Sequence, residues 1–144
     1  MKFSAATLLA AAASVSAATA VFEVKDFTAS CIAHSTFCDY EFKVIQPHSM
    51  ETWEHAVVCN ARAQSTDYTL PDIKDGKCKD SSRTFTVTRG DKGLLVKISQ
   101  PVSPKSNTVG EHFIPNSLLF QSEVPNAEVQ MYNGPKDFEF TQSS

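Results

Sequence analysis

The sequence predicts an all-β protein: a single antiparallel β-sandwich or β-barrel domain with two disulfides. Three observations support this fold class. Apolar and polar residues alternate in several short segments, which is typical of antiparallel strands with one buried face. Clusters of Pro, Gly and Asn separate these segments, at a spacing that favours about seven to ten strands. The cysteines number four, an even count that permits two disulfides.

The first twenty residues have the features of a secretory signal peptide. Lys2 supplies a positive charge, residues 8–13 are apolar, and small residues offer cleavage after position 17, 18 or 20. The apolar run is shorter than the roughly 20 residues that a membrane-spanning helix needs. We therefore expect a signal peptide over residues 1–20, a single β domain over residues 21–144, and a secreted, extracellular product.

The expected strands follow the alternating segments in chain order. Residues 40–44 alternate strictly between apolar and polar. In a second run, Trp53, Val57, Cys59 and Ala61 occupy alternate positions that would share one face of a strand. Further alternating segments are residues 84–88, 94–99, 128–131 and 138–140. Turns are expected at the breaker clusters, residues 46–49, 71–72, 75–76, 101–104, 114–116, 125–126 and 133–135. Trp53 and the phenylalanines of the β domain are expected in the core.

The cysteines lie in the expected β domain, at Cys31, Cys38, Cys59 and Cys78. In the oxidising secretory route they predict two disulfides, for which three connectivities are possible. We favour sequential pairing, Cys31 with Cys38 and Cys59 with Cys78, because each bond then closes a loop between expected strands. Their spacing lacks the paired C-x2-C of zinc sites, and we expect neither a metal nor a cofactor.

Charge and motifs exclude several classes of function. The chain has 13 basic and 16 acidic residues and a net charge of -3, whereas a nucleic-acid binder carries a basic excess. The sequence lacks the G-x-S-x-G, H-E-x-x-H, Walker and Rossmann motifs. We expect no catalytic residues. The four histidines are interpreted as scattered side chains; they are His34, His48, His55 and His112.

Two alternatives to a non-catalytic protein remain open. A small hydrolase needs only two carboxylates about 5 to 10 Å apart, although Glu51, Glu54, Asp72 and Asp75 are equally explained as solvated turn and rim residues. A small-ligand carrier would use an aromatic-lined barrel interior.

Two further segments are interpreted as turns. Residues 72–80 have a faint likeness to a calcium loop, but interleaved lysines and the missing glutamate favour an ordinary turn at Asp75-Gly76. The cell-adhesion tripeptide Arg89-Gly90-Asp91 lies between two alternating segments. Its glycine and Gly93 are expected to supply the positive φ of a tight hairpin.

Specific residues resemble a known family. Phe22-x-Val24-x-Asp26-Phe27-x-Ala29-x-Cys31, then His34-Ser35, Cys38-x-Tyr40-x-Phe42-x-Val44 and Cys59-x-Ala61 resemble secreted fungal proteins that induce the hypersensitive response in plants. These proteins are similar to the major Alternaria allergen family, and Asn133-Gly134-Pro135-Lys136-Asp137-Phe138 looks like a segment of that allergen.

The resemblance implies an antiparallel β-sandwich or barrel with two intrachain disulfides, secretion into the plant apoplast and recognition there by host components. The allergen branch also implies dimers and flavonoid-like ligands. The allergen has a further cysteine soon after the matching Pro-Lys-Asp-Phe stretch, whereas Glu139-Phe140 follows Phe138 in this chain. We therefore expect a monomer or weak dimer and carry no ligand over to named residues.

On this resemblance, we expect a secreted fungal elicitor or effector that triggers plant defence without a catalytic step. Its expected partner is a plant apoplastic or cell-surface protein, with membrane contact through a receptor only.

Overall fold

The computed structural model describes residues 19–122 and 129–143. The expected signal peptide up to residue 18 and the expected turn at residues 125–126 lie outside this part of the chain. The described elements are β1 (Ala20–Cys31), β2 (Phe37–Ile45), η1 (Trp53–His55), β3 (Val57–Gln64), β4 (Ile73–Cys78), β5 (Thr84–Arg89), β6 (Gly93–Ser103), β7 (Ser106–Pro115), η2 (Asn116–Leu118), β8 (Leu119–Gln121), β9 (Gln130–Tyr132) and β10 (Phe138–Gln142). Over the same residues, no helix has the length and apolar character needed to cross a membrane.

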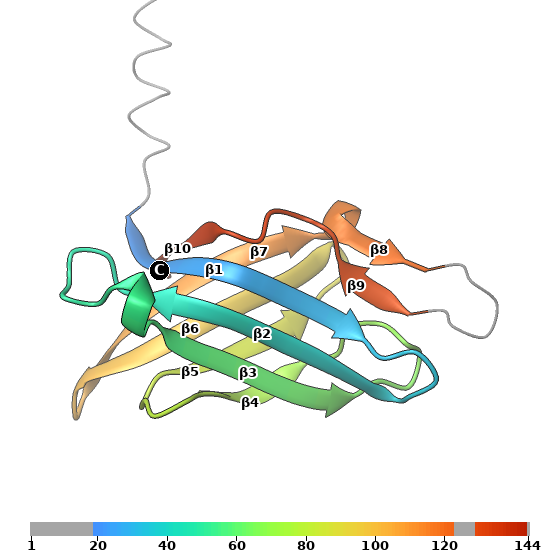
Figure 1. Ribbon diagram of the computed structural model, residues 1–144, viewed down its shortest axis with the longest axis horizontal. Helices are drawn as coiled ribbons and strands as arrows, with labels where there is room; N and C mark the ends of the chain where they lie inside the picture. Colours follow the sequence, from blue (N-terminus) through green and yellow to red (C-terminus); the bar gives the residue numbers. More distant parts are fainter. Residues whose placement is uncertain (1–18, 123–128, 144) are drawn as a thin grey trace, which may run out of the picture.

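Eight strands form a closed antiparallel barrel. Strands β1 to β7 are neighbours in chain order, and β10 closes the barrel between β7 and β1 (Figure 1). The closure is made by register pairs such as Phe22 with Phe140 on the β1 side and Thr141 with Glu111 on the β7 side. The predicted all-β class is therefore confirmed, and the barrel is the form that it takes.

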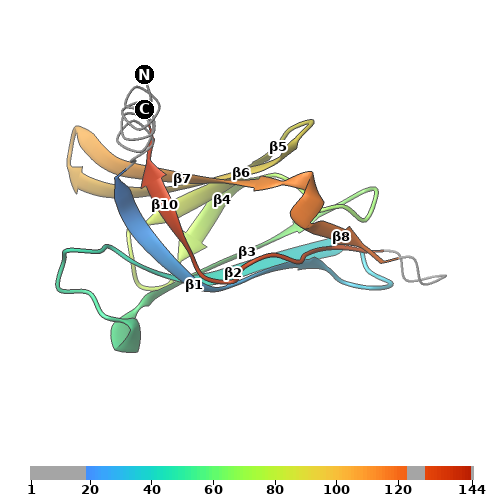
Figure 2. The ribbon, with the colours of Figure 1, turned by 90° about the horizontal axis from the view of Figure 1, so that it is seen from above.

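The antiparallel pair β8 and β9 lies outside this closure. The first half of β1 pairs with β10, whereas its second half pairs with β9 through Ser30 and Met131. Strand β8 then pairs with β9 through Phe120 and Met131. Seen from above, β1, β2, β3 and β8 lie in one layer, with β5, β6 and β7 in a facing layer (Figure 2).

Aromatic side chains fill the barrel interior. Phe22, Phe27, Phe42, Phe85 and Phe140 are each at most 1% exposed. The Phe42 ring lies 5.0 Å from that of Phe85 and 5.6 Å from that of Phe27, between ring centroids. Packed rings of this kind contribute area burial together with favourable ring-to-ring geometry. A small ligand in the interior would have to displace them, which argues against the carrier alternative.

Both disulfides follow the sequential pairing. Cys31 bonds Cys38 and Cys59 bonds Cys78. In each case the two cysteines are register partners on neighbouring antiparallel strands, and their side chains point into the core, at most 5% exposed. The bonds therefore join β1 to β2 and β3 to β4 from the inside of the barrel.

Two expectations for the core are wrong. Trp53 lies in η1 on the outer side of the barrel and is half-buried, so that β3 begins only at Val57. Among the phenylalanines, Phe37, Phe113 and Phe120 are between 37% and 52% exposed. Their strands place them on the outer face of the barrel. Alternation in the sequence shows which residues share a face of a strand, but it does not show which of the two faces is buried.

The expected turns at Asp75-Gly76 and at residues 101–104 are also corrected. Gly76 lies inside β4, where a Cβ atom would come within 2.5 Å of the Phe85 ring. Glycine is thus required there by close packing rather than by a turn. Strand β6 continues through Pro101 to Ser103, which leaves a short connection to β7.

The tripeptide at residues 89–91 forms the predicted hairpin turn. Gly90 N donates to Gly93 O at 2.8 Å, and Gly93 carries the positive φ of 155°. Gly90 does not supply a second positive φ, which corrects part of the expectation. The Arg89 guanidinium is held by Leu70 O and by the Gln130 side chain, so it supports the structure.

Candidate recognition surface

The four histidines lie on separate elements. His34 is in the β1–β2 connection, His48 follows β2, His55 is in η1 and His112 is in β7. Only His112 is partly buried among aromatic rings: its ring stacks on Phe138 at 4.0 Å between centroids. Burial lowers the pKa of His112, and a hydrogen bond to the Glu139 backbone opposes that shift. In the described part of the chain, no group of three or more His, Cys, Asp or Glu side chains could hold a metal ion.

The acidic residues considered from the sequence have structural or surface positions. Glu51 pairs with Arg83 at 2.9 Å, and Asp72 Oδ1 accepts a hydrogen bond from Arg89 N at 2.7 Å. Glu54 and Asp75 are exposed on η1 and β4. These four carboxylates therefore form no common site.

A different pair of carboxylates does converge. Glu23 on β1 and Glu139 on β10 are register partners on the outer face. With Trp53 they line a groove of about 280 Å³, here called the Trp53 groove; its lining residues are Glu23, Val24, Lys25, Trp53, Asp137, Phe138 and Glu139. Each glutamate alternates with buried residues in the sequence, which indicates an outward position. Their pairing across the barrel closure was not visible in the sequence.

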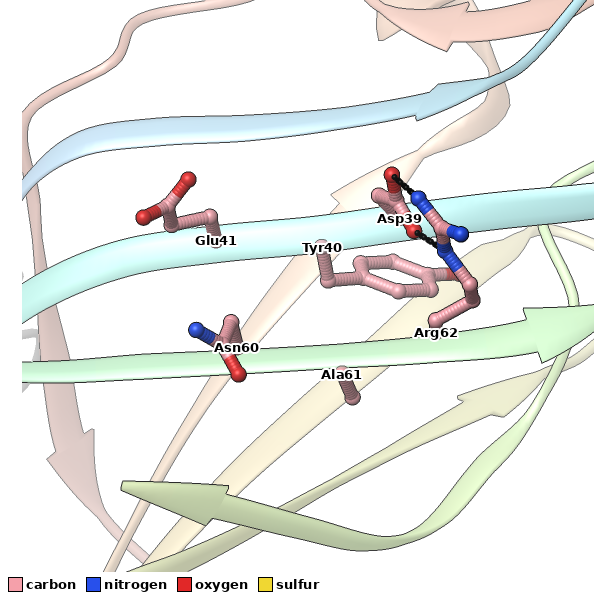
Figure 3. A pocket seen from close by; sticks show the side chains of 6 residues that line it. All are labelled: Asp39, Tyr40, Glu41, Asn60, Ala61 and Arg62. Carbon is pink, nitrogen blue, oxygen red and sulfur yellow. Dashed lines mark hydrogen bonds and ion pairs between the residues drawn. The ribbon is translucent and has the colours of Figure 1, made fainter. Parts of the chain in front are cut away.

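A second depression lies on the outer face of β2 and β3 (Figure 3). Its volume is about 280 Å³, and it is lined by Asp39, Tyr40, Glu41, Asn60, Ala61 and Arg62. Arg62 donates two hydrogen bonds to Asp39, at 2.7 and 3.0 Å. The hydrogen bond and charge of Arg62 lower the pKa of Asp39. The Tyr40 ring points away from this surface, and its hydroxyl, which donates to Pro71 O at 2.8 Å, is buried.

The segments that carry four exposed apolar side chains lie at the end of the barrel where β1 ends and β2 begins (Figure 1). We call this set the apolar end patch; it consists of Ile32, Phe37, Tyr68 and Phe120, with exposures of 36%, 37%, 45% and 52%. Backbone contacts connect the segments that carry them. Ile32 N donates to Phe37 O, and Gln130 N, on the strand beside β8, donates to Tyr68 O, both at 2.9 Å. The Arg62 guanidinium lies over the Phe37 ring at 5.7 Å, which joins the patch to the Asp39–Arg62 depression.

The backbone of Tyr68 is in the left-handed region, with φ 61°, which is an outlier for a bulky residue. A hydrogen-bonded turn holds it there: Asp67 Oδ1 accepts from Thr69 N at 3.2 Å and from Thr69 Oγ1 at 2.6 Å. Ser65 Oγ donates to the same carboxylate at 3.0 Å. Bonds from Thr69 lower the pKa of Asp67. The turn thus presents an exposed tyrosine at a conformational cost, and such strain often accompanies function.

Comparison with family models, with curated proteins and with solved structures found no match to this chain.

Proposed function

We propose that this protein is a secreted fungal elicitor, an effector that acts outside the cell when a plant protein recognises its surface. The family resemblance of the cysteine and strand motifs motivates the proposal. The two disulfides are compatible with an extracellular protein. The host partner would be an apoplastic or cell-surface protein, and the protein would contribute to virulence or defence induction without a reaction of its own.

The observation that carries this proposal is the apolar end patch, which includes the exposed Tyr68. Exposed apolar clusters on soluble proteins commonly mark interaction sites. Binding energy at such sites concentrates in a few anchors enriched in Trp, Tyr and Arg. Tyr68 is exposed, and hydrogen bonds among Ser65, Asp67 and Thr69 hold the turn that carries it, so little loop entropy would be lost on binding.

Leaf infiltration tests the proposal. Purified protein at micromolar concentration should cause cell death and an oxidative burst, and Tyr68→Asn should weaken both responses. Asparagine tolerates the left-handed backbone, so the turn should persist without its aromatic anchor. Phe113→Ser is the matched control, because Phe113 is 47% exposed on β7, outside the patch. A folded wild-type protein that gives no defence response in several plants would contradict the proposal.

One observation favours a second candidate, a small apoplastic hydrolase. Glu23 and Glu139 line one groove together, as a glycoside hydrolase requires of its acid and base. Glu139 is exposed, however, whereas a general acid needs an apolar environment that keeps it protonated. Turnover of a cell-wall polymer by the wild type and its loss in Glu139→Gln would establish the hydrolase in place of the elicitor.

A further inference from the structure

The Trp53 groove contains an unfavourable arrangement of charge. Glu23 and Glu139 are directly opposite each other on antiparallel strands, and like charges in that position are destabilising. Asp137 lines the same groove. Lys25 is the one basic residue among the groove's lining residues. The groove therefore carries an excess of negative charge beside an aromatic ring.

A cation from the chain itself already contacts the Trp53 ring. The Lys25 ammonium lies over the Trp53 ring at 4.8 Å from its centroid, within the range of a cation–π interaction. Lys25 itself is exposed, so its side chain can move away. The nearby acid Asp26 is different, because Lys43 pairs with it at 3.6 Å. In the groove, Asp137 accepts a hydrogen bond from Asp26 N at 3.2 Å. Glu23 and Glu139 make no ion pair with any residue that the structure describes.

We propose that the Trp53 groove binds an arginine side chain from a basic segment of a partner protein. The guanidinium would replace Lys25 on the Trp53 ring and pair with Glu23 and Glu139. This site goes beyond the proposed function, because it lies near the start of β1, whereas the apolar end patch lies where β1 ends (Figure 1).

Charge complementarity favours arginine over the other occupants. A guanidinium is planar, stacks on aromatic faces and donates in pairs to carboxylates, whereas an ammonium is a strongly hydrated point charge. A neutral sugar could also stack on Trp53, but it would leave the repulsion between Glu23 and Glu139 in place. A groove of about 280 Å³ has room for one side chain and not for a folded segment.

Intrinsic fluorescence offers a direct test, since Trp53 is the only tryptophan in the chain. The probe is an acetylated tri-arginine amide, titrated into the full chain at low salt. Matched probes are tri-lysine, tri-citrulline, which keeps the shape of arginine without its charge, and a neutral cello-oligosaccharide. We expect saturable binding of tri-arginine, weaker binding of tri-lysine, and none of tri-citrulline or the sugar.

Four variants define the site. Glu23→Gln and Glu139→Gln should each weaken tri-arginine binding about tenfold, because each removes one charged acceptor. Lys25→Ala should tighten it about threefold, because the competing cation is gone. Glu41→Gln, which removes an exposed acid from the Asp39–Arg62 depression, should leave it unchanged.

Matching urea unfolding curves confirm that each variant is folded. The proposal is overturned if tri-citrulline or the sugar binds as well as tri-arginine. It is equally overturned if Glu41→Gln weakens binding as much as Glu139→Gln, since that result would mean diffuse attraction rather than a site. Neither result depends on the leaf assay.

Discussion

The guanidinium of Arg83 is only 2% exposed and donates to the Glu51 carboxylate, with Nη2 and Oε2 2.9 Å apart. The Gln100 side chain accepts from Arg83 Nε at 2.8 Å, and the Phe22 ring lies 5.2 Å from the guanidinium carbon. This arrangement places the guanidinium at the barrel wall and connects the loop after β2 to β6 and to the residue that precedes β5.

Removing the negative partner should be costly. Glu51→Gln leaves a buried guanidinium without its counter-charge, a defect that destabilises proteins by several kcal/mol. Because the Glu51 side chain is 32% exposed, water offsets part of this, and we expect a loss of about 2 to 3 kcal/mol. Urea denaturation measures the loss. Glu54→Gln, an exposed neighbour, is the control and should be neutral; equal stability of the two variants would contradict the prediction.

The two disulfides should differ in their contribution. Cys59–Cys78 joins β3 to β4, whose ladder has only one other register pair, Asn60 with Lys77. Cys31–Cys38 joins strands that already share six other pairs. Replacing both Cys59 and Cys78 by Ser should therefore cost more, within the range of about 2 to 5 kcal/mol for a native disulfide. Urea unfolding of the two double variants compares them, and a larger loss for the Cys31 and Cys38 variant would refute the ranking.

Acid should weaken the barrel through His112. Burial lowers the pKa of His112 below its ordinary value of 6.5, so the unfolded chain binds the proton more readily than the folded chain. The stabilising contribution is complete above pH 6.5 and decreases as the pH falls toward the folded pKa. His112→Phe keeps an aromatic ring beside Phe138. In urea denaturation, this variant should reduce the change in the free energy of unfolding between pH 7.5 and 5.

The control for this experiment is His48→Asn. His48 is exposed and has a φ of 65°, which asparagine tolerates. This variant should retain the wild-type dependence on pH. If the His112→Phe curve keeps the wild-type slope, another group is responsible for the acid sensitivity.

Tyr68→Asn should stabilise the protein while weakening recognition. The left-handed backbone costs a bulky residue about 1 kcal/mol, and asparagine largely avoids this cost. We expect the free energy of unfolding to rise by about that amount in urea denaturation. A loss of stability would show that the tyrosine packs in place, and would argue that the patch is structural.

If the signal peptide expected from the sequence is cleaved, the mature chain should begin at residue 18 or 19 rather than 21. Ala20 pairs with Thr141, and Gln142 N donates to Thr19 O at 2.9 Å. Of the three expected cleavage positions, only the one after residue 20 removes both contacts with β10. The intact mass of the secreted protein distinguishes the positions, and a chain that starts at Val21 and is equally stable would show these contacts to be dispensable.

The alternation of apolar and polar residues predicted those strands of the barrel whose inward positions are all apolar. Strands β5 and β10 match the expected segments because their inward positions are apolar. Strand β7 was not predicted, since Gly110 and His112 occupy inward positions there. Gly110 is required because a Cβ atom would come within 2.7 Å of Val21, a neighbour distant in sequence. No local pattern contains that information.

The candidate sites were less predictable, because each depends on pairing between distant strands. Glu23 and Glu139 are separated by most of the chain and meet only through barrel closure. Trp53 looked like a core residue because its parity matches Cys59, yet η1 interrupts the run before β3 begins. The disulfide pairing was favoured correctly because both bonds are local, joining residues 7 and 19 positions apart.

The position of β10 in the sequence determines when the barrel can close during synthesis. It is the last strand described, and it pairs with the first. A chain emerging from the ribosome or a membrane pore therefore exposes the open edges of β1 and β7 until residues 138–142 arrive. Unpaired edges of this kind invite association with other chains, and contacts between the two ends form slowly. If the protein is secreted as proposed, secretion at high levels should depend on chaperones that shield these edges, and chains truncated before β10 should aggregate rather than accumulate.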